Sequence, residues 1–155
     1  MTTFLVVASV VGVVVVALGV LALTIRKIAT SATVGALADP AVAGAISAAP
    51  ALLGGIDADG VGSTHGNGAL ALHRDRLVFV LGMPRRTVEI PLADVTSVEV
   101  APALRMPGRY SRGGGPWLKV QWRQAEGTGT AGLLVPEAKK WAQAIRPGEW
   151  IDTTG

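Results

Sequence analysis

The side chains of this sequence best suited to binding chemistry are the basic ones between positions 85 and 123. Seven bases and three acids lie in that range, so seven minus three leaves four surplus positive charges. Three of the arginines lie in the segment ALRMPGRYSRGGGP, whose glycines predict a loop with Met106 and Tyr110 exposed. Such a loop on a rigid sheet suits an anionic lipid or an acidic partner, and the alternative is a solvated loop on a mildly basic protein. The candidate binding residues are Arg85, Arg86, Arg105, Arg109, Tyr110 and Arg112.

The sequence offers no catalytic or metal-binding constellation. It has no cysteine, and its two histidines, His65 and His73, lie among scattered acids, which argues against a zinc site. The stretch Gly60–Gly66 lacks the spacing of a phosphate-binding loop and leads into a predicted strand instead of a helix. We therefore predict no enzyme activity, no cofactor and no metal. The formal net charge of only +3 argues against nucleic acid as a partner.

The first 27 residues predict a membrane anchor. Residues Phe4–Ile25 carry no charge, and as a helix they would be about 33 Å long, which matches a hydrocarbon core of roughly 30 Å. The alternative is a cleaved signal peptide, whose apolar region is shorter, at about 7–15 residues, and follows a basic start. Arg26 and Lys27 follow the span, so the positive-inside rule predicts a single-pass protein of the cell membrane with its C-terminal domain in the cytoplasm.

Residues 28–62 predict a linker, because Ala, Gly and Pro dominate them and interrupt any amphipathic stripe. Beyond them, short apolar runs separated by polar turns predict antiparallel strands. In WLKVQWR (117–123), the residues Leu118, Val120 and Trp122 share one face, as a sheet with one dry side requires. The predicted strands are 68–72, 77–81, 88–92, 98–100, 117–123 and 130–135.

The apolar spacing becomes helical after residue 135, and an amphipathic helix is predicted to end before Pro147. Its apolar face would consist of Ala138, Trp141, Ala142 and Ile145. The predicted fold is α+β: an N-terminal transmembrane helix, then a small antiparallel β-barrel or sandwich capped by a C-terminal helix. The predicted divisions are an anchor over 1–27, a linker over 28–62, the domain over 63–147 and a tail over 148–155. In the tail, Trp150-Ile151 either packs on the domain or is a docking motif.

Several segments in order resemble the bacterial pleckstrin-homology-like, GRAM-related domains. They are GALALHRDRLVFV, PRRTVEIPLADVTSVEV, WLKVQW and the helix PEAKKWAQAI, and together they cover about Gly66–Arg146. The resemblance implies a partly open, seven-stranded barrel plugged by the C-terminal helix, often preceded by a transmembrane helix. It also implies a binding or scaffolding module instead of an enzyme. Six strands are evident, so a seventh would be irregular or lie within Ala103–Arg112.

These observations predict a membrane-anchored interaction module of the pleckstrin-homology-like kind. It would recruit or steady a protein partner at the cytoplasmic face of the membrane. One alternative is a domain that contacts anionic lipid through the Arg105–Arg112 loop. Another is a small accessory subunit of a membrane complex, in which the apolar helix itself makes the contact.

Overall fold

The computed structural model of the chain describes residues 33–59, 61, 64–106, 109–111 and 115–154. The chain divides into two compact units, residues 1–31 and 32–155, and the second holds all the described residues. The predicted transmembrane helix over Phe4–Ile25 lies outside the described residues. Within the described part of the chain, no helix is long and apolar enough to cross a membrane. The described residues therefore give the predicted anchor no support.

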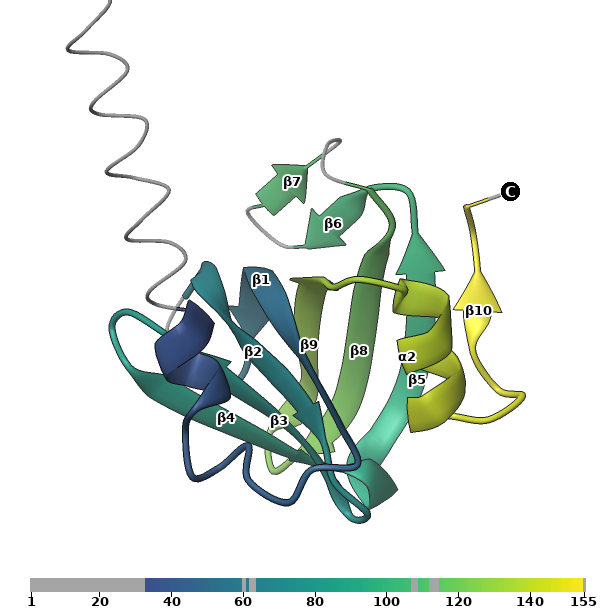
Figure 1. Cartoon of the computed structure of the whole chain (residues 1–155). Helices are drawn as coiled ribbons and strands as arrows, with labels where there is room; N and C mark the ends of the chain where they lie inside the picture. Colours follow the sequence, from purple (N-terminus) through teal and green to yellow (C-terminus); the bar gives the residue numbers. More distant parts are fainter. Residues whose placement is uncertain (1–32, 60, 62–63, 107–108, 112–114, 155) are drawn as a thin grey trace, which may run out of the picture. The chain divides into compact units, whose positions relative to one another are not determined.

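An eight-stranded sheet forms most of the described unit, in the order β10-β5-β8-β9-β1-β2-β3-β4 (Figure 1). Neighbouring strands are antiparallel except β10, which runs parallel to β5. The α+β prediction, strands followed by one C-terminal helix, is confirmed at this level. The strands of this sheet are β1 Ser47–Asp57, β2 Gly66–Leu72, β3 Arg76–Leu81, β4 Arg86–Pro91, β5 Val95–Ala101, β8 Trp117–Gln124, β9 Gly127–Leu134 and β10 Ile151–Asp152, and the 3₁₀ turn η1 is Leu92–Asp94.

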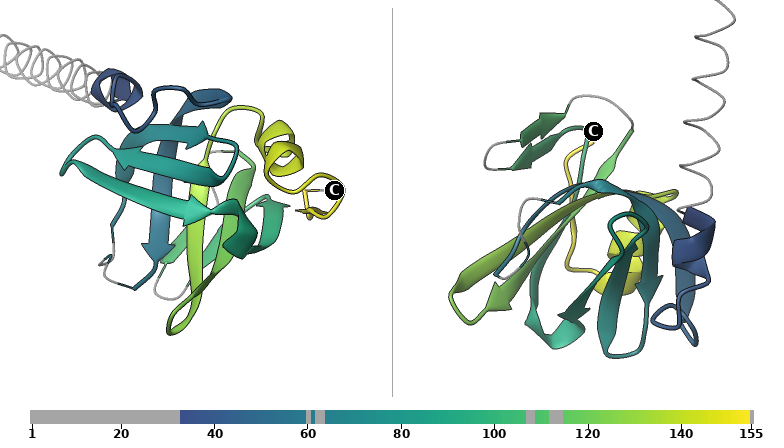
Figure 2. Two further views of the ribbon diagram at one scale, coloured as in Figure 1. Left: turned by 90° about the horizontal axis from the view of Figure 1, so that it is seen from below. Right: turned by 90° about the vertical axis from the view of Figure 1, so that its left-hand side faces the viewer.

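Strand β1 lies in a region that the sequence analysis assigns to a linker. Its first part, Ser47–Leu53, pairs with β2, and its last part, Leu52–Asp57, pairs with β9. The register shifts between Leu53 and Gly55, and the sheet bends at β1, so that β2–β4 form one wall and β9, β8 and β5 the other (Figure 2). The linker prediction for residues 28–62 is wrong over this strand, because its alanines, glycines and proline hide the alternating burial that marks a strand.

The core lies between the two walls, and helix α2 (Ala138–Ile145) packs beside it in contact with β5 and β8. Trp122 and Trp141 both belong to this core, as the sequence predicts. The predicted buried faces of β8 and α2 are also confirmed: they consist of Leu118, Val120 and Trp122 on the strand, and of Ala138, Trp141, Ala142 and Ile145 on the helix.

Residues 33–46, which we call the cover segment, lie over the outer face of β2 and β3. Residues 33–37 are helical, and turns follow up to residue 44. Ala36 and Val42 are buried there against four residues of the sheet, namely Ala69, Ala71, Val78 and Val80. This second cluster explains why β3 is apolar from Leu77 to Leu81, since that run is buried on both faces as predicted. The cover segment is a second part of the predicted linker that packs on the domain.

Strands β6 (Leu104–Met106) and β7 (Arg109–Ser111) form a separate hairpin next to β9. Leu104 is buried and packs over two glycines: it fills the space at Gly132 of β9 and shares with Trp117 the space at Gly54 of β1. A Cβ atom on Gly132 would overlap the Leu104 side chain, whose Cδ2 would be 2.9 Å away. The predicted exposed loop is therefore in part a hairpin, anchored by one leucine on the outer face of the sheet.

The C-terminal tail packs back on the domain. Trp150 contacts the core, and its indole N–H donates to Gln143 Oε1 at 2.7 Å. Asp152 in β10 forms an ion pair with Lys139, in which Nζ lies 2.6 Å from Oδ2. This bond from Lys139, followed by those from Thr154, lowers the pKa of Asp152 to about 2. Of the two alternatives for Trp150-Ile151, the structure shows packing on the domain for Trp150, whereas the side chain of Ile151 is exposed.

Candidate functional site

Four of the six predicted binding residues belong to the β6–β7 hairpin and the residues after it. Arg105 is exposed on β6. Tyr110 is its cross-strand neighbour on β7, and Arg109 lies one position before Tyr110. Arg112 lies outside the described residues. The hairpin lies above β1 and β9 in Figure 1, whereas the other two predicted residues, at the β3–β4 turn, lie at the left of the sheet. The structure therefore does not bring all six residues into one site.

Arg85, at the β3–β4 turn, holds the cover segment. Its guanidinium forms an ion pair with the buried carboxylate of Asp39, with Nε donating to Oδ2 at 2.9 Å. The backbone N–H of Ala41 donates to Oδ1 of Asp39 at 2.8 Å. The Ala41 amide first, and Arg85 second, hold the pKa of Asp39 below its ordinary value. The buried ring of His73 places Nε2 3.0 Å from the Ala41 carbonyl oxygen, while Arg86 is exposed.

This arrangement makes Arg85 an anchor between the cover segment and the sheet instead of a free ligand-binding group. Sequence reasoning missed Asp39, its partner, because the two residues are 46 positions apart. A local signal was available, since Asp39-Pro40 is typical of a turn closed by the aspartate side chain. Such a turn is present, and its closing bond is the one from the Ala41 amide.

A pocket of about 320 Å³ lies where the hairpin meets the outer face of β5 and β8 and the C-terminal tail. Arg105 and Lys119 line it together with Glu99 and Thr153. Lys119 Nζ lies 3.8 Å from Glu99 Oε2, and the Thr153 hydroxyl donates to Glu99 Oε1 at 3.2 Å. Two cations and one carboxylate leave this outer pocket with a small positive surplus, which suits a single anionic group.

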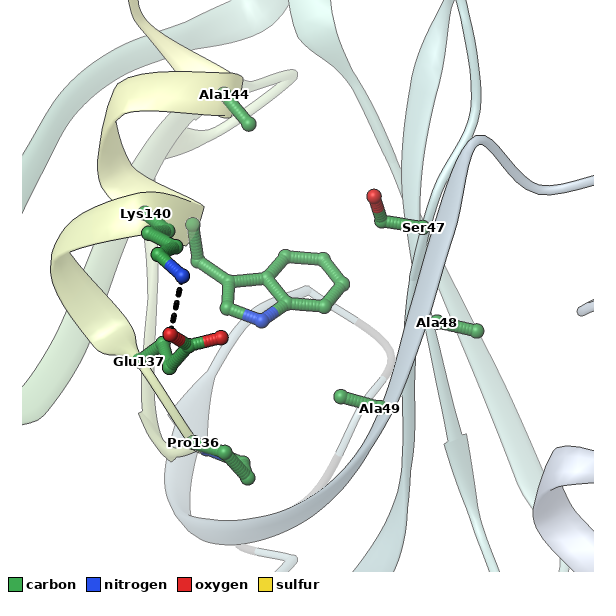
Figure 3. A pocket seen from close by; sticks show the side chains of 8 residues that line it. Ser47, Ala48, Ala49, Pro136, Glu137, Lys140 and Ala144 are labelled. Carbon is green, nitrogen blue, oxygen red and sulfur yellow. Dashed lines mark ion pairs between the residues drawn. The ribbon is translucent and has the colours of Figure 1, made fainter.

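A groove of about 260 Å³ runs between the beginning of β1 and helix α2 (Figure 3). We call it the β1–α2 groove. One side is formed by the strand and the other by the helix and the residues before it. Glu137 and Lys140 on the helix side form an ion pair with each other, drawn as the dashed line in Figure 3. The lining residues are Ser47, Ala48 and Ala49 on the strand side, and Pro136, Glu137, Lys140, Trp141 and Ala144 on the helix side.

The strand side of the β1–α2 groove is an edge that no other described strand covers. Strand β2 pairs with β1 along the whole of Ser47–Leu53, but pairing with β9 begins only at Leu52. After Leu134 the chain leaves β9 and enters α2, so no described residue continues the sheet beside Ser47–Ala51. In these residues, which we call the free edge, the backbone groups that point away from β2 have no strand partner in the described part of the chain. Unpaired edges of this kind are templates for another extended segment.

Sequence reasoning found only the helix side of this groove. It placed Trp141 on the apolar face of α2 and Lys140 on the polar face, as the structure does. It assigned Ser47–Ala49 to a linker, so the two sides could not be combined. Among the described residues, no three histidine, aspartate or glutamate side chains gather where a metal ion could bind.

Comparison with known proteins found no match among family models, curated proteins or solved structures. The predicted membership of the bacterial pleckstrin-homology-like family is contradicted by this result. Its physical weakness is that alternating strands, short turns and an amphipathic helix are what any antiparallel sheet covered by a helix requires. The order of such segments therefore says more about fold class than about family.

Proposed function

We propose that this domain is a protein-interaction module that docks a segment of a partner protein in the β1–α2 groove. The observation that carries this proposal is the free edge Ser47–Ala51 opposite Trp141. A free strand edge supplies backbone hydrogen bonds, and an indole supplies a rigid apolar surface, which together are the common ingredients of peptide recognition. A protein partner is retained from the sequence-based hypothesis, and docking in the groove requires no membrane anchor.

The test is a photo-crosslinking amino acid placed at Ala144, an exposed position that lines the groove. The matched control carries the same amino acid at Ala125, an exposed alanine in the β8–β9 turn that does not line it. We expect crosslinks from position 144 that map to one contiguous segment of one protein, and none to that segment from position 125. Equal crosslinking from both positions, or none from position 144, would contradict the proposal.

A second candidate function is anion binding in the outer pocket, favoured by the meeting of Arg105 and Lys119 there. It retains the predicted role of the hairpin arginines toward an anionic lipid or an acidic partner. We expect the full-length chain to bind vesicles that contain an anionic lipid more tightly than neutral ones, and the double substitution Arg105→Ala and Lys119→Ala to remove that preference. Arg123→Ala, at another exposed base of β8, is the control. Unchanged binding by the double variant would exclude the outer pocket.

A further inference from the structure

We infer that the partner segment joins the sheet as an added strand along the free edge of β1, and that this segment is extended and uncharged. The inference rests on the proposed function, because it states how the β1–α2 groove is filled and by what chemistry. It is carried by two independent observations, the unpaired backbone of the free edge and the charge balance of the groove lining.

The backbone of the free edge is already held in strand geometry by β2 on its other side. At roughly 3.3 Å per residue, Ser47–Ala51 offers an edge about 17 Å long. Each hydrogen bond to it would therefore form without ordering β1 first, which is the main cost of pairing two strands. Only alternate residues of the free edge direct their N–H and C=O groups away from β2, and Pro50, which has no N–H, can only accept.

An added strand fits this geometry better than a docked helix. A helix satisfies its own backbone groups and would leave those of the free edge without partners as it excluded water from them. It is also about 10 Å across with its side chains, whereas neighbouring strands are about 4.8 Å apart. The strand side carries only small side chains, Ser47, Ala48 and Ala49, while the largely buried Trp141 indole lies between them and the helix (Figure 3), so an added backbone would pack against the indole as it pairs with the edge.

The charge balance of the groove favours an uncharged segment. Of the described residues that line it, only Glu137 and Lys140 have acidic or basic side chains, and these form an ion pair with each other. A charged side chain brought into the groove would lose hydration and find no unpaired counter-charge there. The other lining side chains are alanine, serine, proline and tryptophan, which complement a small or apolar side chain of the segment facing Trp141.

The experiment uses short random peptides displayed on phage as the probe and the full-length chain as the target. Ala144→Arg fills the groove from an exposed helix position, and Ala125→Arg makes the same change in the β8–β9 turn. We expect selected peptides to be uncharged at their centre. Their affinity should fall about tenfold or more with Ala144→Arg and stay unchanged with Ala125→Arg.

Backbone methylation of a selected peptide then tests strand addition itself. Alternate N–H groups of an added strand face β1, so methylating that set should weaken binding about tenfold or more, while methylating the intervening set should not. Bound peptide should also slow amide exchange within Ser47–Ala49.

Each contrary result has a different meaning. Equal loss from both methylated sets, with unchanged amide exchange in Ser47–Ala49, would overturn strand addition and leave groove docking in place. Selected peptides with a charged centre would overturn the predicted chemistry of the segment. If the chain self-associates and Ala144→Arg abolishes this self-association, a second copy of the chain occupies the groove. The inference of a partner segment would then be overturned. If no selected peptide responds to Ala144→Arg, the proposed function fails together with this inference.

Discussion

Two segments cover the outer face of the bent sheet, and they are held there by different forces. The cover segment places small side chains, Ala36 and Val42, on β2 and β3, and is tied down by Asp39 through polar bonds. The β6–β7 hairpin instead places one large side chain, Leu104, in the space above Gly54 and Gly132. The cover segment therefore depends on hydrogen bonds and an ion pair, and the hairpin depends on the packing of one large side chain.

This difference predicts the conditions under which the cover segment and the hairpin each lose their contact with the sheet. Apolar contact in a filled space does not depend on the protonation of any group, so the hairpin contact should be insensitive to pH. A carboxylate whose pKa is lowered by folding stabilises the fold only while it is ionised, so the cover segment should loosen in acid. Removing the key residue of each cover tests this contrast.

The largest effect is expected from Leu104→Ala, which empties the space above Gly132 and part of the space above Gly54. Removing a buried leucine side chain lowers the free energy of unfolding by about 3 kcal/mol, because both burial and packing are lost. Urea denaturation of the full-length chain measures this change. Arg105→Ala, the next residue and an exposed one, is the control and should cost less than about 1 kcal/mol. Equal costs for the two variants would mean that the hairpin is not held by Leu104.

A somewhat smaller effect is expected from Gly132→Ala, which adds a methyl group where Leu104 already lies. Overfilling a packed site costs about 2 kcal/mol. Combined with Leu104→Ala, the added methyl has room, so the double variant should be more stable than the sum of the two losses predicts. Urea denaturation of the wild type, the two single variants and the double variant measures the coupling free energy between the two positions. Strict additivity would show that the two residues do not share the space.

The sequence predicted those parts of the fold that depend on strong apolar patterns. Strand β3 could be predicted because both of its faces are buried, and β8 because its faces differ sharply in polarity. Strand β1 could not, because its alanines, glycines and proline have the composition of a linker. One of these glycines, Gly54, lies where Trp117 and Leu104 leave no room for a side chain, and such packing has no local sequence signal.

The candidate site was less predictable for the same reason. Its helix side depends on Trp141, which a 3.6-residue period identifies, but its strand side depends on the pairing of β1 with two partners. Pairing of distant strands is decided by tertiary structure and has no local signal. The charge of an arginine can be read from the sequence but its partner cannot: Arg85 forms an ion pair with Asp39, 46 residues away.

For the cover segment, Asp39→Asn should reduce stability less than either change at the hairpin, and in a pH-dependent way. The pKa of Asp39 is lowered in the folded state, so its stabilising effect is complete above the unfolded pKa of about 4 and is lost as pH falls through the lower folded value. The difference in denaturation midpoint between the wild type and Asp39→Asn should therefore narrow below about pH 4. Asp57→Asn, at an exposed aspartate, is the control. If this difference in denaturation midpoint stayed constant down to about pH 2, the cover segment would be held by apolar packing, as the hairpin is, and not by the charge of Asp39.

The smallest effect, and the sharpest comparison, is expected from Arg85→Ala. The Ala41 amide is the larger cause of the lowered pKa of Asp39, and this bond survives the substitution. The pKa of Asp39, followed by NMR of its carboxyl carbon, should therefore rise only part of the way to its ordinary value. Arg86→Ala, the exposed neighbour, should leave it unchanged. A full return to the ordinary value with Arg85→Ala would show that one side chain holds the cover segment, as Leu104 holds the hairpin. A partial return would show that the Ala41 amide also stabilises the carboxylate, so that the cover segment, unlike the hairpin, is held by more than one contact.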